Sequence, residues 1–228
     1  YIIERMEENG FITKEQAVSA KQEELKIRTA TSSFNTHADY VAEMARQLMF
    51  AQYGPEIYTR GLNVYTTIRA SDQQAAYFAL RRGIMDYERR QHYRGPERFI
   101  NLPTKPAELE DAIDDALIEQ GDKGDLLAAV VLEATPKKVR VMRQNSEVLE
   151  ITGDGLQPVQ SGLSDKAAPN IKLRPGALVR ITKTAKGGWE ITQLPEVEGA
   201  FVSIDPRDGA IHALVGGFDF NKNKFNHV

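Results

Sequence analysis

The chain has 228 residues, of which 41% are hydrophobic and 27% are charged, a composition typical of a globular protein and not of a disordered one. Its net charge of −3, from 29 basic and 32 acidic residues, provides no overall field that would attract nucleic acid or an anionic membrane. The absence of cysteine excludes disulfides and thiol chemistry, and no apolar run reaches the roughly 20 residues of a membrane span.

Helical patterns dominate the first third of the chain. Residues 2–9 have a helical pattern that ends at a glycine, and Thr13 lies three residues before Gln16. This spacing is that of a capping box, which predicts a second short helix. Residues 23–36 have no periodicity and are rich in Ser, Thr and Asn near their end, so they predict a linker.

The next segment combines helices with one strand. Apolar residues recur at helical spacing over 41–49, which predicts a helix that stops at a Gly-Pro pair. Residues 62–68 alternate and are rich in β-branched side chains, so they predict a strand. Ser71 and Gln74 have capping-box spacing and predict a helix that continues to about Tyr93.

A last helix is predicted over 106–120, because a proline suits its first turn and Gly121 its end. After it the hydrophobic period changes from 3.6 to 2. Short strands are then predicted over residues 126–133, 139–142, 148–151, 177–181 and 189–192. Residues 153–176 lack a period and predict a long connection. Together these features predict an OB-like antiparallel β-barrel over 122–195.

Two strongly apolar strands close the chain. They are predicted over 200–204 and 210–215, and the Asp205–Gly209 segment between them is a hairpin signal. Because both strands are apolar on both faces, we expect them to lie in a larger sheet. Their expected partner is the strand at 62–68, which would make the barrel an insertion between parts of one sheet. The fold class is therefore α+β.

Candidate chemistry is sparse. The four histidines do not have metal-ligand spacing; they are His37, His92, His212 and His227. An acidic cluster is placed by its spacing on the polar face of the helix at 106–120, where a solvated helix face is favoured over a metal site; its members are Glu110, Asp111, Asp114 and Asp115. Neither a Walker loop nor a Gly-x-Ser-x-Gly elbow occurs, and none of the eight serines has a lysine three positions later. The residues therefore indicate no catalytic, metal or cofactor site.

The basic residues of the stranded block suggest a docking face. Residues predicted at outward or edge positions of its strands are Lys138, Arg140, Arg180 and Lys183. Residues 122–195 carry 11 basic against 8 acidic residues, and an OB-fold nucleic-acid-binding module is the alternative function for such a block. Single-strand binding needs aromatic platforms, and Trp189 is the only aromatic residue of the block. A solvated strand face is therefore favoured over nucleic-acid binding, and any contact made by these basic residues is expected to be with a protein or the cell wall.

The C-terminal residues GAFVSIDPRDGAIHALVGGFDFNKNKFNHV, 199–228, resemble the opening of the transpeptidase domain of class A penicillin-binding proteins. The segment YIIERMEENGFITKEQA is similar to the helical tail of that family's glycosyltransferase domain. HADYVAEMARQL and GLNVYTTIRASDQQAA are similar to its interdomain linker and first transpeptidase strand and helix. Because the family also inserts an OB-like domain at this place, the resemblance covers the whole chain, and it is strongest to the 1a branch of Gram-negative bacteria.

This resemblance implies a division of the chain into four parts. Residues 1–36 would be the end of the glycosyltransferase domain with a linker, and 37–121 the interdomain linker with the first transpeptidase elements. Residues 122–195 would be the OB-like domain, and 196–228 the start of the transpeptidase domain. The family's Ser-x-x-Lys motif would follow after Val228, so the resemblance assigns no catalytic residue to this chain.

The resemblance also implies a function and a location. The parent protein would be a bifunctional peptidoglycan synthase, tethered to the inner membrane by parts outside this chain, and the chain would be a non-catalytic connecting and docking region in the periplasm. Its implied partners are peptidoglycan or a periplasmic activator protein. The resemblance implies neither a metal nor an organic cofactor for this region, and no nucleic acid.

Overall fold

The computed structural model describes residues 2–22 and 36–228, which belong to two compact units, residues 1–35 and 36–228. The first unit contains helices α1 (Ile2–Glu8) and α2 (Lys14–Gln22). The predicted capping box is confirmed, because the Thr13 amide donates to Gln16 Oε1 at 2.8 Å and the Gln16 amide donates to Thr13 Oγ1 at 3.3 Å. Most of the linker predicted over 23–36 lies outside the described residues.

The second unit begins with helices that the sequence largely predicts. Helix α3 (Asp39–Tyr53) ends at Gly54, which has a left-handed φ of 62°, and the 3₁₀-helix η1 (Gly54–Tyr58) follows. Helix α4 (Ala70–Glu88) begins before the predicted capping box and ends before the predicted Tyr93. The reason for its early start is that the Gln73 amide already donates to the Arg69 carbonyl, so Arg69 is the N-cap residue.

The strand predicted over 62–68 is not formed in the described structure. This segment is extended, but its contacts with a neighbouring strand are a bond from the Thr67 hydroxyl to the Ile211 carbonyl at 2.7 Å and one from the Arg69 amide to the His212 carbonyl at 2.9 Å. Both acceptors lie in strand β8 (Ile211–Val215). The expected pairing of this segment with the two C-terminal strands is therefore wrong, because in the described residues β8 and residues 201–204 form a two-stranded sheet of their own.

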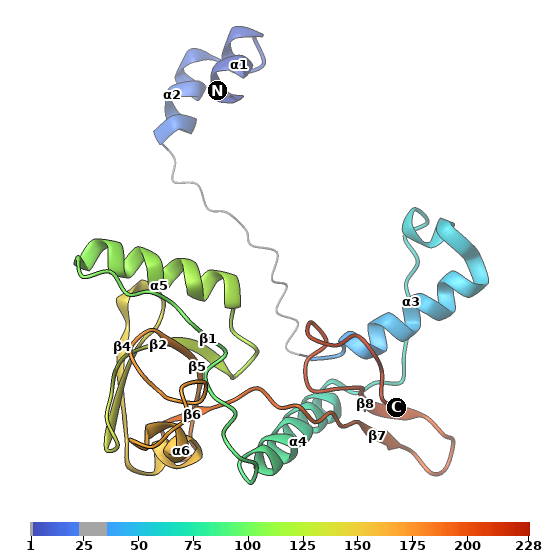
Figure 1. Cartoon of the computed structure of the whole chain (residues 1–228). Coiled ribbons are helices and arrows are strands. Elements are labelled where there is room, and N and C mark those ends of the chain that lie inside the picture. The colour runs from blue at the N-terminus through green and yellow to red at the C-terminus, as the bar shows by residue number, and fades with distance from the viewer. Residues whose placement is uncertain (1, 23–35) are drawn as a thin grey trace. The chain divides into compact units, whose positions relative to one another are not determined.

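The OB-like block is an antiparallel sheet with helices on both sides (Figure 1). Its strands are β1 (Arg98–Phe99), β2 (Leu127–Ala134), β3 (Lys138–Met142), β4 (Val148–Thr152), β5 (Ala177–Lys183) and β6 (Trp189–Thr192). Its helices are α5 (Pro106–Gln120), η2 (Gln144–Ser146), η3 (Gly153–Val159) and α6 (Gln160–Leu163). The five predicted strands are confirmed, and β1 and η3–α6 are additions that the sequence did not predict.

The sheet does not close into the predicted barrel. Its strands follow the order β1-β5-β2-β3-β4, and β6 pairs with β5 on the same edge as β1. Within residues 36–228, no strand pairing joins β4 to β6. The two strands approach each other without pairing, and η3 contacts both of them. The sheet is therefore antiparallel but open.

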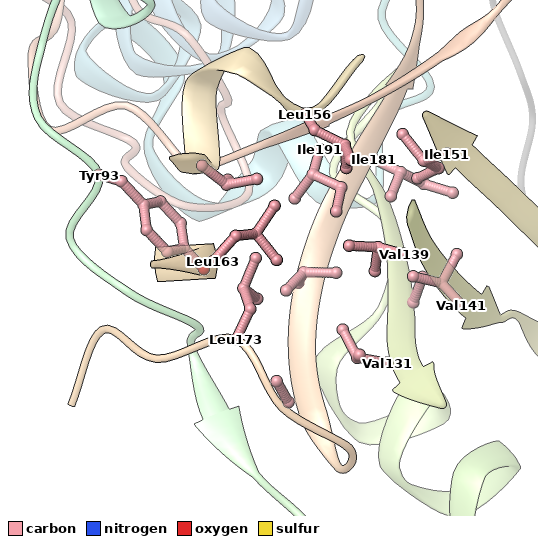
Figure 2. Packing of buried hydrophobic residues seen from close by; sticks show 14 residues of the cluster. Tyr93, Val131, Val139, Val141, Ile151, Leu156, Leu163, Leu173, Ile181 and Ile191 are labelled. Atoms are coloured by element: carbon pink, nitrogen blue, oxygen red, sulfur yellow. The ribbon is translucent and has the colours of Figure 1, made fainter. Parts of the chain in front are cut away.

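The main hydrophobic core lies on the concave side of this sheet (Figure 2). Val139 and Val141 of β3 face Ile181 and Ile191 of β5 and β6, as their alternation predicts. The core is completed by the connection between β4 and β5, whose buried side chains are Leu156, Val159, Leu163 and Leu173. This connection, predicted as irregular, is thus part of the core.

Helix α5 covers the opposite face of the sheet (Figure 1). Its Ile113 and Leu117 pack on Ala128 and Val130, which alternate along β2 with the residues of the main core. Its acidic residues remain on the outer side, as predicted, with Asp114 at the margin of the contact. Strands β2 and β5 are therefore buried on both faces over most of their length.

Strands β7 (Phe201–Ile204) and β8 form the predicted hairpin. The Asp205 carboxylate accepts from the Arg207 amide at 3.0 Å and from Arg207 Nη2 at 2.7 Å. The hydrogen bonds of Arg207 hold the pKa of Asp205 at about 2, below its ordinary value, so this carboxylate is ionised and fixes the turn. In the described residues the hairpin is a two-stranded sheet packed on α4.

A glycine in η3 provides a test of this architecture. A Cβ at Gly155 would meet the Trp189 carbonyl oxygen and would lie 2.9 Å from Ile151 Cγ2. The position of η3 therefore depends on the absence of a side chain at residue 155. We expect Gly155→Ala to lower the free energy of unfolding by at least about 2 kcal/mol through overpacking.

The matched control is Gly83→Ala in α4, where a Cβ meets open space and alanine favours the helix by about 1 kcal/mol. Urea denaturation of both variants measures the difference. Equal stability of the Gly155 variant and the original chain would show that η3 does not pack against β6 in this way.

Candidate functional site: docking surface and domain junction

Lys138 and Arg140 lie on the outer side of β3, where the sequence placed them. Their side chains are 39% and 44% exposed and alternate with the buried Val139 and Val141. Each has an acidic neighbour on the next strand, since Lys138 Nζ lies 3.9 Å from Glu150 Oε2 and Arg140 Nη1 lies 3.7 Å from Glu133 Oε2. The outer face of β3 is therefore of mixed charge and is not a basic patch.

Lys183 is the exposed end of β5 and contacts an aromatic ring. Its Nζ lies 5.4 Å from the centroid of the Trp189 ring on β6, a cation–π contact across the turn between the two strands. The only aromatic side chain in the sequence of residues 122–195 is thus already in contact with a cation.

Arg180 was predicted at an outward position and is instead buried, with 1% of its surface exposed. Its Nε donates to Glu97 Oε1 at 2.5 Å and its Nη1 donates to the Gly121 carbonyl at 2.5 Å. The cause is helix α5, which covers this face of β5 and directs the negative end of its dipole at the guanidinium. Arg180 is therefore a structural cation and does not belong to a docking face.

The strand register also places Lys183 far from Lys138 and Arg140. Ile181 lies opposite Leu127 at the start of β2, so Lys183 lies beyond that end. Arg140 lies opposite Glu133 near the end of β2, so Lys138 lies beyond the other end. Eight residues of β2 span roughly 26 Å at 3.3 Å per residue. Of the residues expected to form a docking face, Lys138 and Arg140 remain together on the outer face of β3.

A second candidate region joins the OB-like block to the rest of the unit. Arg81 of α4 is buried, and its Nη1 donates to the Phe218 carbonyl at 2.7 Å while its Nη2 donates to the Lys123 carbonyl at 3.1 Å. Its Nε donates to Asp125 Oδ1 at 3.0 Å, and the guanidinium lies 3.9 Å from the centroid of the Phe218 ring. One side chain of α4 therefore binds the OB-like block, just before β2, to the segment that follows β8.

The C-terminal end of α4 makes a further polar junction. The buried Glu88 forms an ion pair with Arg94 at 2.6 Å and accepts from Gln193 Nε2 at 2.6 Å. The Arg94 amide donates to Gln193 Oε1 at 3.0 Å, and its Nη2 donates to the Leu194 carbonyl at 2.6 Å. The chain segments that enter and leave the OB-like block are thus bound directly to each other.

The sequence analysis missed these junction residues, although a signal for them exists. Gln73, Arg81 and Glu88 are buried on the face of α4 that carries the apolar residues Ala76 and Ile84. A polar residue on the apolar face of a helix requires buried partners, which marks it as part of a specific contact. In the described residues, no group of three or more His, Asp or Glu side chains is arranged to hold a metal ion.

Comparison with known proteins identifies this arrangement. The family profile described as "Penicillin-binding protein OB-like domain" matches residues 93–197. Penicillin-binding protein 1A of Neisseria flavescens is 34% identical over 228 residues, which cover 100% of this chain and 28% of that protein. The chain belongs to the class A penicillin-binding proteins.

Further relatives and a solved structure agree. Penicillin-binding protein 1A of Escherichia coli K12 is 33% identical over 234 residues, which cover 100% of this chain and 27% of that protein. The crystal structure of penicillin-binding protein 1A from Haemophilus influenzae matches with a TM-score of 0.76 and 29% identity, over 99% of this chain and 32% of that chain. The chain thus spans less than a third of these penicillin-binding proteins. The range that the OB-like domain profile matches begins at residue 93, before β1 and α5.

Arg81 gives a test of the junction. We expect Arg81→Lys to lower the free energy of unfolding by about 3 kcal/mol, because an ammonium group cannot donate to Phe218, Lys123 and Asp125 in the planar arrangement of a guanidinium. Arg82→Lys is the matched control, since the Arg82 side chain is exposed on the same helix. Denaturant unfolding measures both, and equal stabilities would contradict the structural role of Arg81.

Proposed function

We propose that this chain is the non-catalytic connecting and docking region of a bifunctional peptidoglycan synthase, which polymerises glycan and crosslinks peptides. The observation that carries the proposal is the similarity of the whole chain to penicillin-binding protein 1A, together with the TM-score of 0.76 to a solved member. The sequence has no serine followed three positions later by lysine, so the acylated serine of the parent would lie outside it.

The geometry of the junction supports the connecting role. Glu88 binds α4 to both ends of the OB-like domain, Arg81 binds it to the segment just before β2, and α4 also packs on the β7–β8 hairpin. A domain held at separate points by buried polar side chains of one helix has a defined orientation relative to that helix. In the parent protein the OB-like domain would therefore be presented at a constant position relative to the crosslinking domain.

The proposed location is the periplasm, with a tether to the inner membrane in another part of the parent. Of the helices in residues 2–22 and 36–228, none has the length and apolar character needed to cross a membrane. We also propose that the OB-like domain works as a barrel-like unit in which η3 replaces a β4–β6 pairing. The contacts of η3 with both strands support this.

Binding of nucleic acid, the alternative function, is not favoured. The acidic neighbours of Lys138 and Arg140 leave few cations to neutralise phosphates, and Lys183 already contacts Trp189. The proposed partners are peptidoglycan or a periplasmic activator protein, each able to meet a face of mixed charge through paired polar contacts.

Labelling with fluorescent penicillin tests the proposed parent activity. We expect no covalent band for the 228-residue chain on a denaturing gel and a band for the full-length gene product, because acylation requires the serine of a Ser-x-x-Lys motif. Competition by unlabelled penicillin is the control for specific acylation. A band for the 228-residue chain, or none for the full-length product, would overturn the proposal.

Sedimentation with purified peptidoglycan tests the docking role. We expect the chain to co-sediment, and we expect Lys138→Glu with Arg140→Glu to reduce the bound fraction several-fold, because the face then carries only negative charge near Glu133 and Glu150. Lys172→Glu is a control on the connection between β4 and β5, away from β3. Retained binding by the double variant would contradict docking through this face.

A further inference from the structure

Helix α3 has one buried side chain in its contact with the segment that follows β8. Tyr40 is the buried residue of α3 and is only 5% exposed, while the other residues of this helix are exposed or partly exposed. Its hydroxyl donates to the Asn223 carbonyl at 2.7 Å, and its ring meets the Phe220 ring edge-on with centroids 5.0 Å apart. Both partners lie in the segment that follows β8.

The segment that follows β8 is shaped to receive this ring. A Cβ at Gly216 would lie 2.7 Å from Tyr40 Cδ1, and a Cβ at Gly217 would meet the Tyr40 hydroxyl oxygen. Any other residue at either position would therefore displace the ring or the backbone. The Gly-Gly pair and the tyrosine form one packed contact between α3 and the residues after β8.

Two further contacts extend this arrangement. Asn226 Nδ2 donates to Met44 Sδ at 3.1 Å, one helical turn after Tyr40, and the His227 amide donates to the Gly216 carbonyl at 2.9 Å. The segment 216–227 is thus folded back on itself and bound along α3. We name this contact the tyrosine clamp, formed by Tyr40, Gly216, Gly217 and Asn223.

The raised pKa of the Tyr40 hydroxyl suits a hydrogen-bond donor that must keep its proton. Burial, followed by the nearby carboxylates of Glu198, Asp219 and Asp39, raises the pKa of Tyr40 to about 12. The hydroxyl therefore keeps its proton and donates to Asn223 at every physiological pH. A tyrosinate would appear only in strongly alkaline solution, where the clamp would lose its donor.

We propose that Tyr40 is a positioning residue for penicillin acylation, through which helix α3 sets the conformation of the segment 216–227. The proposal rests on the proposed function, because that function places the acylated serine in the chain that continues from this segment. Since Tyr40 is the buried residue of α3 and packs against Gly216 and Gly217, a displacement of the helix would move the ring against this segment. The conformation of the linker helix would thus be coupled to the crosslinking site.

The test measures acylation of the full-length gene product by fluorescent penicillin as a time course, which separates the rate constant from the labelled fraction. We expect Tyr40→Ala to reduce the rate constant at least about tenfold, as expected for a displaced reacting group, and to leave the final labelled fraction unchanged. Tyr40→Phe keeps the ring, loses the bond to Asn223 and should have an intermediate rate. A merely structural role would lower the labelled fraction at an unchanged rate.

Two controls keep this test decisive. Tyr53→Ala changes an exposed tyrosine at the other end of α3 and should retain the original rate. Gly217→Ala leaves Tyr40 in place but pushes its ring away, so it should reduce the rate as Tyr40→Ala does. If the unaltered protein is labelled and all variants react at its rate, the clamp has no positioning role. If the unaltered protein is not labelled, the proposed function itself fails.

Discussion

The buried guanidinium of Arg81 is the constraint on which the arrangement of the second unit depends. A cation removed from water must be surrounded by acceptors, and here they are backbone carbonyls of Lys123 and Phe218 and the carboxylate of Asp125. Lys123 and Asp125 lie inside the OB-like domain, just before β2, and Phe218 lies in the segment that follows β8. Helix α4 can therefore bury its apolar face only when both segments have reached their final positions, which links the folding of the two parts.

Arg180 is a second buried cation surrounded by acceptors, and it lies inside the OB-like domain. It pairs with Glu97 just before β1 and with the carbonyl of Gly121 at the end of α5, so a strand, a helix and a two-residue edge strand meet at one cation. Neither arginine stabilises the fold through exposed salt bridges, which contribute little. Both act because an unpaired charge in their positions would be strongly unfavourable.

Much of the fold follows from local patterns. Helices α3 and α5 and strands β2 to β6 were predicted because their periods and their glycine or proline ends are encoded within each segment. Helix η3 was not, because Gly155 and Pro158 obscure the helical spacing of Leu156 and Val159.

The candidate site was harder to predict than the fold. Burial of Arg180 depends on α5, and the distance between Lys138 and Lys183 depends on strand register, which no local pattern contains.

The direct bond between Arg94 and Gln193 has a consequence for how such a protein can diversify. Because the chain leaves α4 and returns towards β7 at neighbouring points, the intervening domain can lengthen, shrink or be exchanged without separating these two elements. Its size is thus free to vary in a way that the contact between α4 and the hairpin is not.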